Sequence, residues 1–164
     1  MFQQLLLAID DSPGSQVAVS FAVSLAEPGT TSVRVFYVNE YLVGGRGITL
    51  HTQAEATDLV ADAMRQLNST KIEATGAVCI ASYRQVADRI VEAARDHGAD
   101  AIVLGSSRRR YLGRLFSRQL RERTTRLTAL PVITAPPPLE VAGARFELWD
   151  AIKQGSDKKR TVVN

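Results

Sequence analysis

Short apolar runs alternate with longer amphipathic stretches along most of this chain, and that alternation restricts its fold more than any other feature. The first run, residues 5–9, is apolar without a break and ends at the turn-forming residues 10–14. An uninterrupted apolar run of this length is typical of a strand buried on both faces of a parallel sheet. The stretch that follows repeats apolar side chains every four positions, at Val17, Phe21 and Leu25. That period predicts a helix that packs through one face.

The same alternation continues to about residue 135. Further strands are predicted over residues 33–38, 74–80, 101–104 and 131–135, and further helices over residues 56–67, 86–97 and 120–127. We expect Gly76 to weaken the third strand and Gly98 to end the third helix. Because helical crossovers between parallel strands are right-handed, this order predicts an α/β fold: an open five-stranded parallel sheet with helices on both faces.

Three consecutive prolines, residues 136–138, divide the chain. Residues 1–137 are long enough to form one α/β domain with its own core. Residues 138–164 form a predicted C-terminal extension that is partly helical or disordered. Its apolar residues Phe146, Trp149 and Ile152 suit one short amphipathic turn, whereas its last residues are charged and are expected to lack order.

The sequence argues against several classes of protein. No apolar run approaches the roughly 18 residues that a membrane span needs, and residues 5–9 are too short for a signal peptide and lack its basic segment. Cys79 is the only cysteine, which leaves no internal disulfide, and we expect it to be a buried packing thiol. His51 and His97 stand apart from other metal-ligating residues in the sequence. We therefore expect a cytoplasmic protein with no bound metal and no membrane contact.

Positive charge is concentrated in one segment. Residues 105–126 hold eight arginines and a single acid, Glu122, so this segment carries +7 although the formal net charge of the whole chain is only +3. Such a basic strip on an acidic body suggests an anionic ligand or partner at one place. The alternative is a solvated helix face along which arginine stems pack.

Polar residues follow three of the predicted strands at the point where each strand ends. Asp10, Asp11 and Ser12 follow the first, Asn39 follows the second, and the Gly-Ser-Ser turn at residues 105–107 follows the fourth. In an open parallel sheet, ligands bind beyond these carboxyl ends, where the strand order reverses. An acid can accept hydrogen bonds from a ribose or a base, while turn amides and a helix N-terminus can hold phosphate. The pattern therefore suggests a nucleotide crevice.

Three segments of the sequence resemble one known family. Residues 6–12, LLAIDDS, resemble the first strand and turn of universal stress proteins, and residues 101–106, AIVLGS, resemble their fourth strand. The segment LGRLF at 112–116, followed by a helix and by LPVI at 130–133, resembles their closing pattern. The resemblance covers residues 1 to about 137. It implies a Rossmann-like, adenine nucleotide alpha hydrolase-like sheet with strand order 3-2-1-4-5.

The chain departs from this family's ATP-binding motif. Members that bind ATP carry Gly-x2-Gly-x9-Gly followed by Ser or Thr, because phosphate oxygens must approach the backbone closely and a β-carbon obstructs them. Here Gly105 fills the first position, but Arg108, Arg118 and Gln119 occupy the other three. We therefore predict that ordinary ATP binding is lost. The two arginines either hold a phosphate through their guanidinium groups or fill the empty pocket and pair with Asp10 or Asp11.

The nucleotide-binding positions that the resemblance implies are Asp10, the backbone of Val38, Gly105, Ser106, Arg108, Arg118 and Gln119. No catalytic residue is predicted, since neither Ser12 nor Ser15 has a neighbouring histidine and each suits a turn or helix cap.

The sequence supports three hypotheses of function. The leading one is a non-catalytic stress-response or regulatory protein that binds no cofactor, and the resemblance implies that it forms a homodimer through the fifth strand, at Val132, Ile133 and Thr134. The alternative is a nucleotide-binding switch for AMP, a cyclic nucleotide or ATP that uses Asp10 and the arginine-modified phosphate loop. In the third, the arginine strip contacts nucleic acid or an acidic protein.

Overall fold

The computed structural model describes residues 2–41, 47–106 and 118–137. In order, its elements are β1 (Gln4–Ile9), α1 (Pro13–Leu25), β2 (Ser32–Glu40), α2 (Gln53–Ser69), β3 (Glu73–Ala81), the short 3-10 helix η1 (Tyr83–Gln85), α3 (Val86–Asp96), β4 (Ala101–Leu104), α4 (Arg118–Leu127) and β5 (Val132–Thr134). The predicted sequence of strands and helices is confirmed. The predicted C-terminal extension, residues 138–164, lies outside the described residues.

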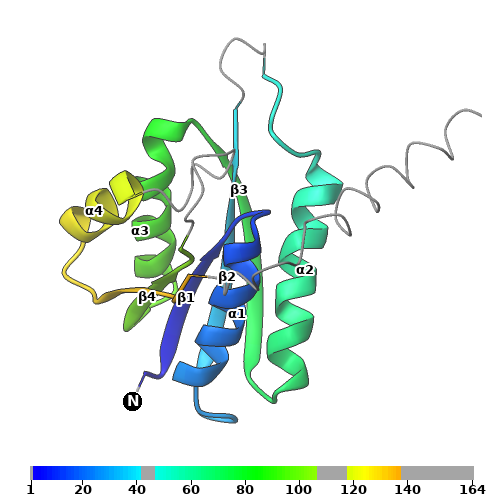
Figure 1. The fold of residues 1–164 in the computed structure, drawn as a ribbon, viewed down its shortest axis with the longest axis vertical. Coiled ribbons are helices and arrows are strands. Elements are labelled where there is room, and N and C mark those ends of the chain that lie inside the picture. The colour runs from blue at the N-terminus through cyan, green and yellow to red at the C-terminus, as the bar shows by residue number, and fades with distance from the viewer. Residues whose placement is uncertain (1, 42–46, 107–117, 138–164) are drawn as a thin grey trace, which may run out of the picture.

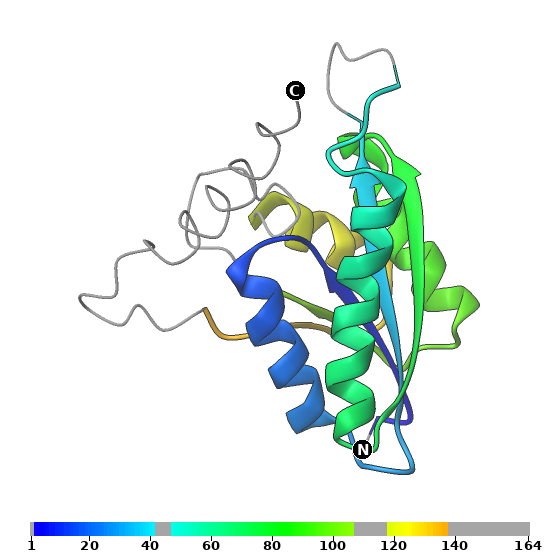
Figure 2. The same cartoon turned by 90° about the vertical axis from the view of Figure 1, so that its right-hand side faces the viewer.

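The five strands form one parallel sheet in the order β3-β2-β1-β4-β5, as predicted. Helices α1 and α2 cover one face of the sheet, and α3 and α4 cover the other (Figures 1 and 2). β1 is the central strand, with Leu5 in register with Val33 of β2 on one side and with Ala101 of β4 on the other. β2 and β3 therefore extend the sheet on one side of β1, and β4 and β5 extend it on the other. The strand order reverses between β1 and β4.

The core lies on both faces of β1. Leu5, Leu6 and Leu7 have no exposed surface, and all four residues of β4 are equally inaccessible. This burial explains why β1 and β4 are apolar without alternation, since side chains on each face of a central parallel strand meet a layer of helices.

A carboxylate fastens the start of β1 to the start of β4. Asp100 Oδ2 accepts hydrogen bonds from the backbone N–H groups of Gln3, at 2.6 Å, and Gln4, at 2.8 Å. These bonds lower the pKa of the Asp100 carboxyl below its usual value, with the bond from Gln4 as the largest cause. The contact fixes the register at which two strands distant in sequence meet.

The edge strands differ in exposure. β3 is an edge strand, and its Cys79, predicted to be buried, is only half-buried, because little covers the outer side of this strand; burial still raises the pKa of the thiol. The three residues of β5 at the other edge are half-buried. The homodimer through β5 stays a prediction. No helix within the described ranges is both long and apolar enough to span a membrane.

The sequence predicts only that Gly76 weakens β3. The structure also gives this glycine a role in packing. A β-carbon at this position would overlap Val60 Cγ1 of α2 and lie 2.5 Å from Met64 Sδ. The absence of a side chain therefore lets α2 lie close against the edge of the sheet.

We expect Gly76→Ala to lower the free energy of unfolding by about 1–3 kcal/mol, the usual cost of overpacking, with Met64 moving aside more readily than the stiff Val60 side chain. Urea denaturation measures the change. Thr75→Ala, at the exposed neighbouring position of the same strand, is the control. A Gly76→Ala protein as stable as the control would show that α2 has room to move away.

Candidate functional site

The candidate site lies at the carboxyl ends of β1, β2 and β4. The direction of the connections reverses between β1, which leads to α1 on one face, and β4, which leads toward α4 on the other (Figure 1). Asp10, Asp11 and Ser12 follow β1, and Gly105 and Ser106 follow β4. Asn39 lies within β2 and not after it, because β2 continues to Glu40. The predicted residues are therefore brought to one edge of the sheet, as is typical of a ligand crevice.

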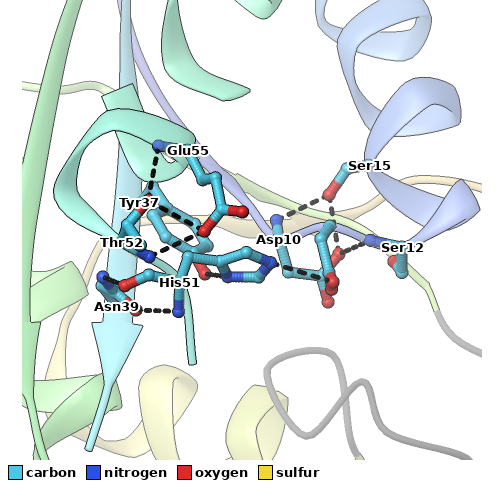
Figure 3. A network of polar contacts seen from close by, with 9 residues as sticks. Asp10, Ser12, Ser15, Tyr37, Asn39, His51, Thr52 and Glu55 are labelled. Atoms are coloured by element: carbon cyan, nitrogen blue, oxygen red, sulfur yellow. Dashed lines mark hydrogen bonds and ion pairs between the residues drawn. The ribbon is translucent and has the colours of Figure 1, made fainter. Parts of the chain in front are cut away.

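Asp10 is a buried carboxylate whose two oxygens differ in their contacts with the described residues. Its Oδ1 accepts hydrogen bonds from the Ser12 backbone N–H at 2.9 Å and from the Ser15 hydroxyl at 2.8 Å (Figure 3). The Asp10 backbone N–H donates back to Ser15 Oγ at 2.7 Å. Its Oδ2 has no hydrogen-bond partner among the described residues, although the residue as a whole is only 4% exposed. Burial raises the pKa of Asp10, while the bonds from Ser12 and Ser15 oppose the rise.

The hydroxyl groups of Ser12 and Ser106 are also buried and unpartnered within the described part of the chain. Ser12 stands at the N-cap of α1, but its side chain makes no capping bond. The predicted helix-cap role of the Ser12 side chain is therefore wrong, since the N–H of Ser15, which such a cap would bond, donates to the Ser12 backbone carbonyl at 3.0 Å. Ser15 does not cap the helix either, because its hydroxyl serves Asp10.

The two loops that carry these serines are in direct contact. A β-carbon added to Gly14, in the first turn of α1, would lie 2.5 Å from the Ser106 carbonyl oxygen and 3.3 Å from Ser12 Oγ. The turn after β4 therefore packs against the start of α1, beside Asp10. Buried polar atoms without a partner cost about 1–3 kcal/mol each, so a group of them calls for a ligand or ordered water.

A second polar cluster joins β2 to the loop before α2. The Tyr37 hydroxyl lies 2.7 Å from His51 Nδ1, and His51 Nε2 lies 3.3 Å from Asp11 Oδ2 (Figure 3). The Asn39 side chain donates from Nδ2 to the His51 carbonyl at 2.8 Å and accepts from the His51 N–H at Oδ1, at 3.1 Å. His51 is therefore not the isolated loop residue that the sequence suggested. The signal that could have found this cluster is the pair Tyr37 and Asn39, two polar residues on one face of a buried strand.

Negative charge surrounds this end of the sheet. Burial is the main cause of the raised pKa of Tyr37, and the charges of Asp11, Asp10, Glu40 and Glu55 add to it in that order. Glu55 takes part in the capping box that begins α2, where its carboxylate accepts from the Thr52 N–H at 2.8 Å. These bonds from Thr52 lower the pKa of Glu55. Tyr37 therefore lies among acidic side chains at this end of the sheet. Because its pKa is raised, its hydroxyl stays protonated.

The other predicted site residues divide between the crevice and the surface. Val38 is buried in β2, and Gly105 and Ser106 are buried after β4. Arg118, at the start of α4, is 85% exposed and pairs with Glu122 at 2.7 Å. The alternative in which Arg118 pairs with Asp10 or Asp11 is therefore wrong, because the guanidinium binds an acid one turn along its own helix. Gln119 is exposed and accepts from the Tyr83 hydroxyl at 3.4 Å. Arg108 lies outside the described residues.

The described arginines of the basic strip all lie on α4. Arg123 pairs with Asp88 of α3 at 2.7 Å. Arg118, Arg121 and Arg126 line a hollow of about 500 Å³ beside Thr134 of β5. Neither Arg121 nor Arg126 forms an ion pair with a described residue. Asp10, Ser12 and Ser106 do not line this hollow, and an anionic partner for it stays a prediction.

The chain is similar to proteins of known family. The model of the universal stress protein family matches residues 1–136. Among solved structures, a universal stress protein family member from Burkholderia pseudomallei has a TM-score of 0.62 and 22% identity over 82% of this chain and 96% of that chain.

Two solved structures of the same fold contain nucleotides. A universal stress protein from Archaeoglobus fulgidus in complex with dAMP has a TM-score of 0.63 and 21% identity over 82% of this chain and 98% of that chain. A universal stress protein in complex with cAMP has a TM-score of 0.60 and 18% identity over 82% and 96%. At these identities the likeness supports the fold alone. No curated protein matches the chain.

Proposed function

The chain belongs to the universal stress protein family, and on this premise we propose that it is a non-catalytic regulatory protein that binds AMP or a cyclic nucleotide beside Asp10 and does not bind MgATP in the ordinary way. The proposal takes the regulatory, non-catalytic role from the leading hypothesis and the nucleotide site from the alternative, and it gives up the expectation that no cofactor binds. It concerns the crevice at the ends of β1, β2 and β4.

The observation that carries the proposal is the group of three buried oxygens that have no partner among the described residues: Asp10 Oδ2, Ser12 Oγ and Ser106 Oγ. A carboxylate oxygen needs a donor, and ribose hydroxyls and the adenine amino group are donors. The serine hydroxyls can donate to or accept from a ribose or a phosphate. The dAMP and cAMP complexes of two proteins with this fold support the same class of ligand.

The preference for one phosphate rests on charge and on steric room. The motif positions that would bring bare backbone to a triphosphate carry Arg108, Arg118 and Gln119. Arg118 is engaged with Glu122 and exposed to solvent. Asp11, half-exposed beside the crevice, adds negative charge. Each additional phosphate therefore increases repulsion without the backbone contacts that offset it.

A catalytic role has no support in the site. Ser15, the hydroxyl nearest to a carboxylate, already donates to Asp10 and accepts from its backbone N–H. Among the described residues, no three metal-ligating side chains of the His, Cys, Asp or Glu types gather to hold a metal ion. In this proposal a bound nucleotide acts by its presence, as a signal.

We expect Asp10→Asn to weaken the binding of AMP by at least about 10-fold, because a hydrogen bond to a charged group contributes about 1.5–3 kcal/mol. The substitution preserves shape but replaces the free acceptor with a donor. Isothermal titration calorimetry with AMP, cAMP, ADP and ATP, with and without Mg²⁺, measures the affinities. Asp58→Asn, at an exposed position of α2, is the matched control.

Two results would contradict the proposal in different ways. Absence of heat with every nucleotide would remove nucleotide binding altogether. Tightest binding with MgATP would leave a nucleotide site but overturn the preference for one phosphate.

A further inference from the structure

His51 is held in place more firmly than an ordinary loop residue. Its backbone N–H and carbonyl are both bonded to the side chain of Asn39, and the Thr49 hydroxyl donates to the same carbonyl at 2.6 Å. Its ring is fixed at Nδ1 by Tyr37 at 2.7 Å. The next residue, Thr52, begins α2 with a capping box. Such support from neighbouring residues is what a binding residue needs to keep its geometry.

The two contacts of the ring together determine which nitrogen carries the proton. A carboxylate can only accept, so Nε2, 3.3 Å from Asp11 Oδ2, carries the proton. In the neutral ring Nδ1 is then an acceptor, and the Tyr37 hydroxyl, 2.7 Å away, donates to it. In the positively charged ring, both nitrogens carry protons. In either state His51 offers a donor at Nε2.

Asp11, which accepts from His51 Nε2, is loosely held. The separation of 3.3 Å is longer than a good hydrogen bond, and the Asp11 side chain is 53% exposed. A polar contact of such exposure contributes little to stability. Asp11 can therefore turn into water at small cost when a better acceptor arrives.

The His51 donor is linked to the loop that carries the unpartnered oxygen of Asp10. Asp11, which faces His51 Nε2, stands between Asp10 and Ser12 in the loop after β1, and the charges of Asp10 and Asp11 both reach Tyr37, the other partner of the ring. The acids whose charges reach this cluster are Asp10, Asp11, Glu40 and Glu55. The site thus offers an acceptor at Asp10 Oδ2, after β1, and a donor at His51 Nε2, in the loop that Asn39 of β2 holds. A nucleoside carries both complementary groups.

We propose that His51 is a ligand-binding residue of this crevice and that Asp11 is a latch, which occupies the His51 donor until an acceptor atom of the ligand, a base nitrogen or a ribose oxygen, displaces it. This inference rests on the proposed function and names a residue and a gating contact of the same site. It explains why a loop histidine whose side chain is 22% exposed is fixed by three polar side chains.

The first test needs no ligand. The chain has two histidines, so nitrogen-15 correlation spectra of the imidazole rings resolve each tautomer. We expect His51 to carry its proton on Nε2 and Tyr37→Phe to produce a mixture of tautomers. We expect Asp11→Ala to shift the His51 Nε2 resonance and to leave His97 unchanged. A neutral His51 ring protonated only on Nδ1 in the wild-type protein would overturn the proposal.

The second test titrates AMP into variants whose fold is checked by circular dichroism. We expect His51→Ala to weaken binding by about 2- to 10-fold, the worth of one hydrogen bond, and His51→Gln, which keeps a side-chain donor, to restore most of it. We expect Asp11→Ala to strengthen binding by a similar factor. Asp58→Ala, which removes an exposed carboxylate on α2, is the control and should change nothing.

The outcomes separate the latch from the nucleotide site. If Asp10→Asn weakens AMP binding while the His51 and Asp11 variants match wild type, the nucleotide site stands and the latch is overturned. Binding by Asp11→Ala alone, with none by wild type, would overturn the proposed function and also the latch, because the ligand would then not displace Asp11 in the native chain. If no nucleotide binds any variant, Asp11→Ala included, both proposals fail.

Discussion

Replacing Gly14 with valine is expected to lower the free energy of unfolding by about 3 kcal/mol, at the upper end of overpacking costs. The reason is that a β-carbon here would lie 2.5 Å from the Ser106 carbonyl oxygen, which is backbone and cannot turn away as a side chain does. The loop after β4 or the first turn of α1 must move. Because Ser12 and Ser106 lie at this contact, we also expect weaker binding of AMP. Chemical denaturation and calorimetry measure the two effects.

Ser20→Ala is the matched control for Gly14→Val. Ser20 lies on the exposed side of the same helix, so its replacement should change stability by no more than about 0.5 kcal/mol. If Gly14→Val unfolds at the same denaturant concentration as this control, the two loops are not packed as tightly as the structure has them.

Leu6→Ala is expected to lower the free energy of unfolding by about 2–5 kcal/mol. Leu6 has no exposed surface and lies in the central strand, in register with Arg34 of β2 and Ile102 of β4. Its removal leaves a cavity between the sheet and the helices that cover it, because side chains of a strand point away from the plane of the sheet. Thermal and chemical denaturation measure the loss, and a part of the protein purified at 37 °C should already be unfolded or aggregated.

The control for this core substitution is Leu50→Ala. Leu50 is 46% exposed in the loop before α2, so the same loss of atoms should cost no more than about 0.5 kcal/mol. Equal losses for Leu6→Ala and Leu50→Ala would mean that burial in the sheet does not decide the contribution of a leucine.

The fold could be predicted because its signals are local. The run at residues 5–9 lies within β1, and the repeat of Val17, Phe21 and Leu25 lies within α1. The ends of the strands were harder to predict than their positions. β2 and β3 continue beyond their predicted ends to Glu40 and Ala81, because they pair with each other beyond the end of β1. Pairing of that kind depends on a partner distant in sequence, which a local pattern does not contain.

The site could be predicted only where it follows directly from strand ends. Asp10 and Ser106 lie at the edge where parallel strands end, as their positions in the sequence indicated. The role of His51 could not be predicted, since it depends on Tyr37, fourteen residues away, and on Asp11, forty residues away. Nor could the sequence show that Arg118 would bind Glu122, because the i,i+4 pair competes with carboxylates that only folding brings near.

The carboxylate of Asp100, bonded to the N–H of Gln4 across a separation of 96 residues, has a consequence for synthesis. A ribosome adding about 5–20 residues per second releases β1 roughly 5–20 s before β4 can reach it. During that interval β1 can pair with at most one neighbouring strand, whereas in the finished sheet it pairs with β2 on one side and β4 on the other. The growing polypeptide is therefore most prone to aggregate before its fourth strand emerges, and a chaperone that shields nascent chains would matter most in that period.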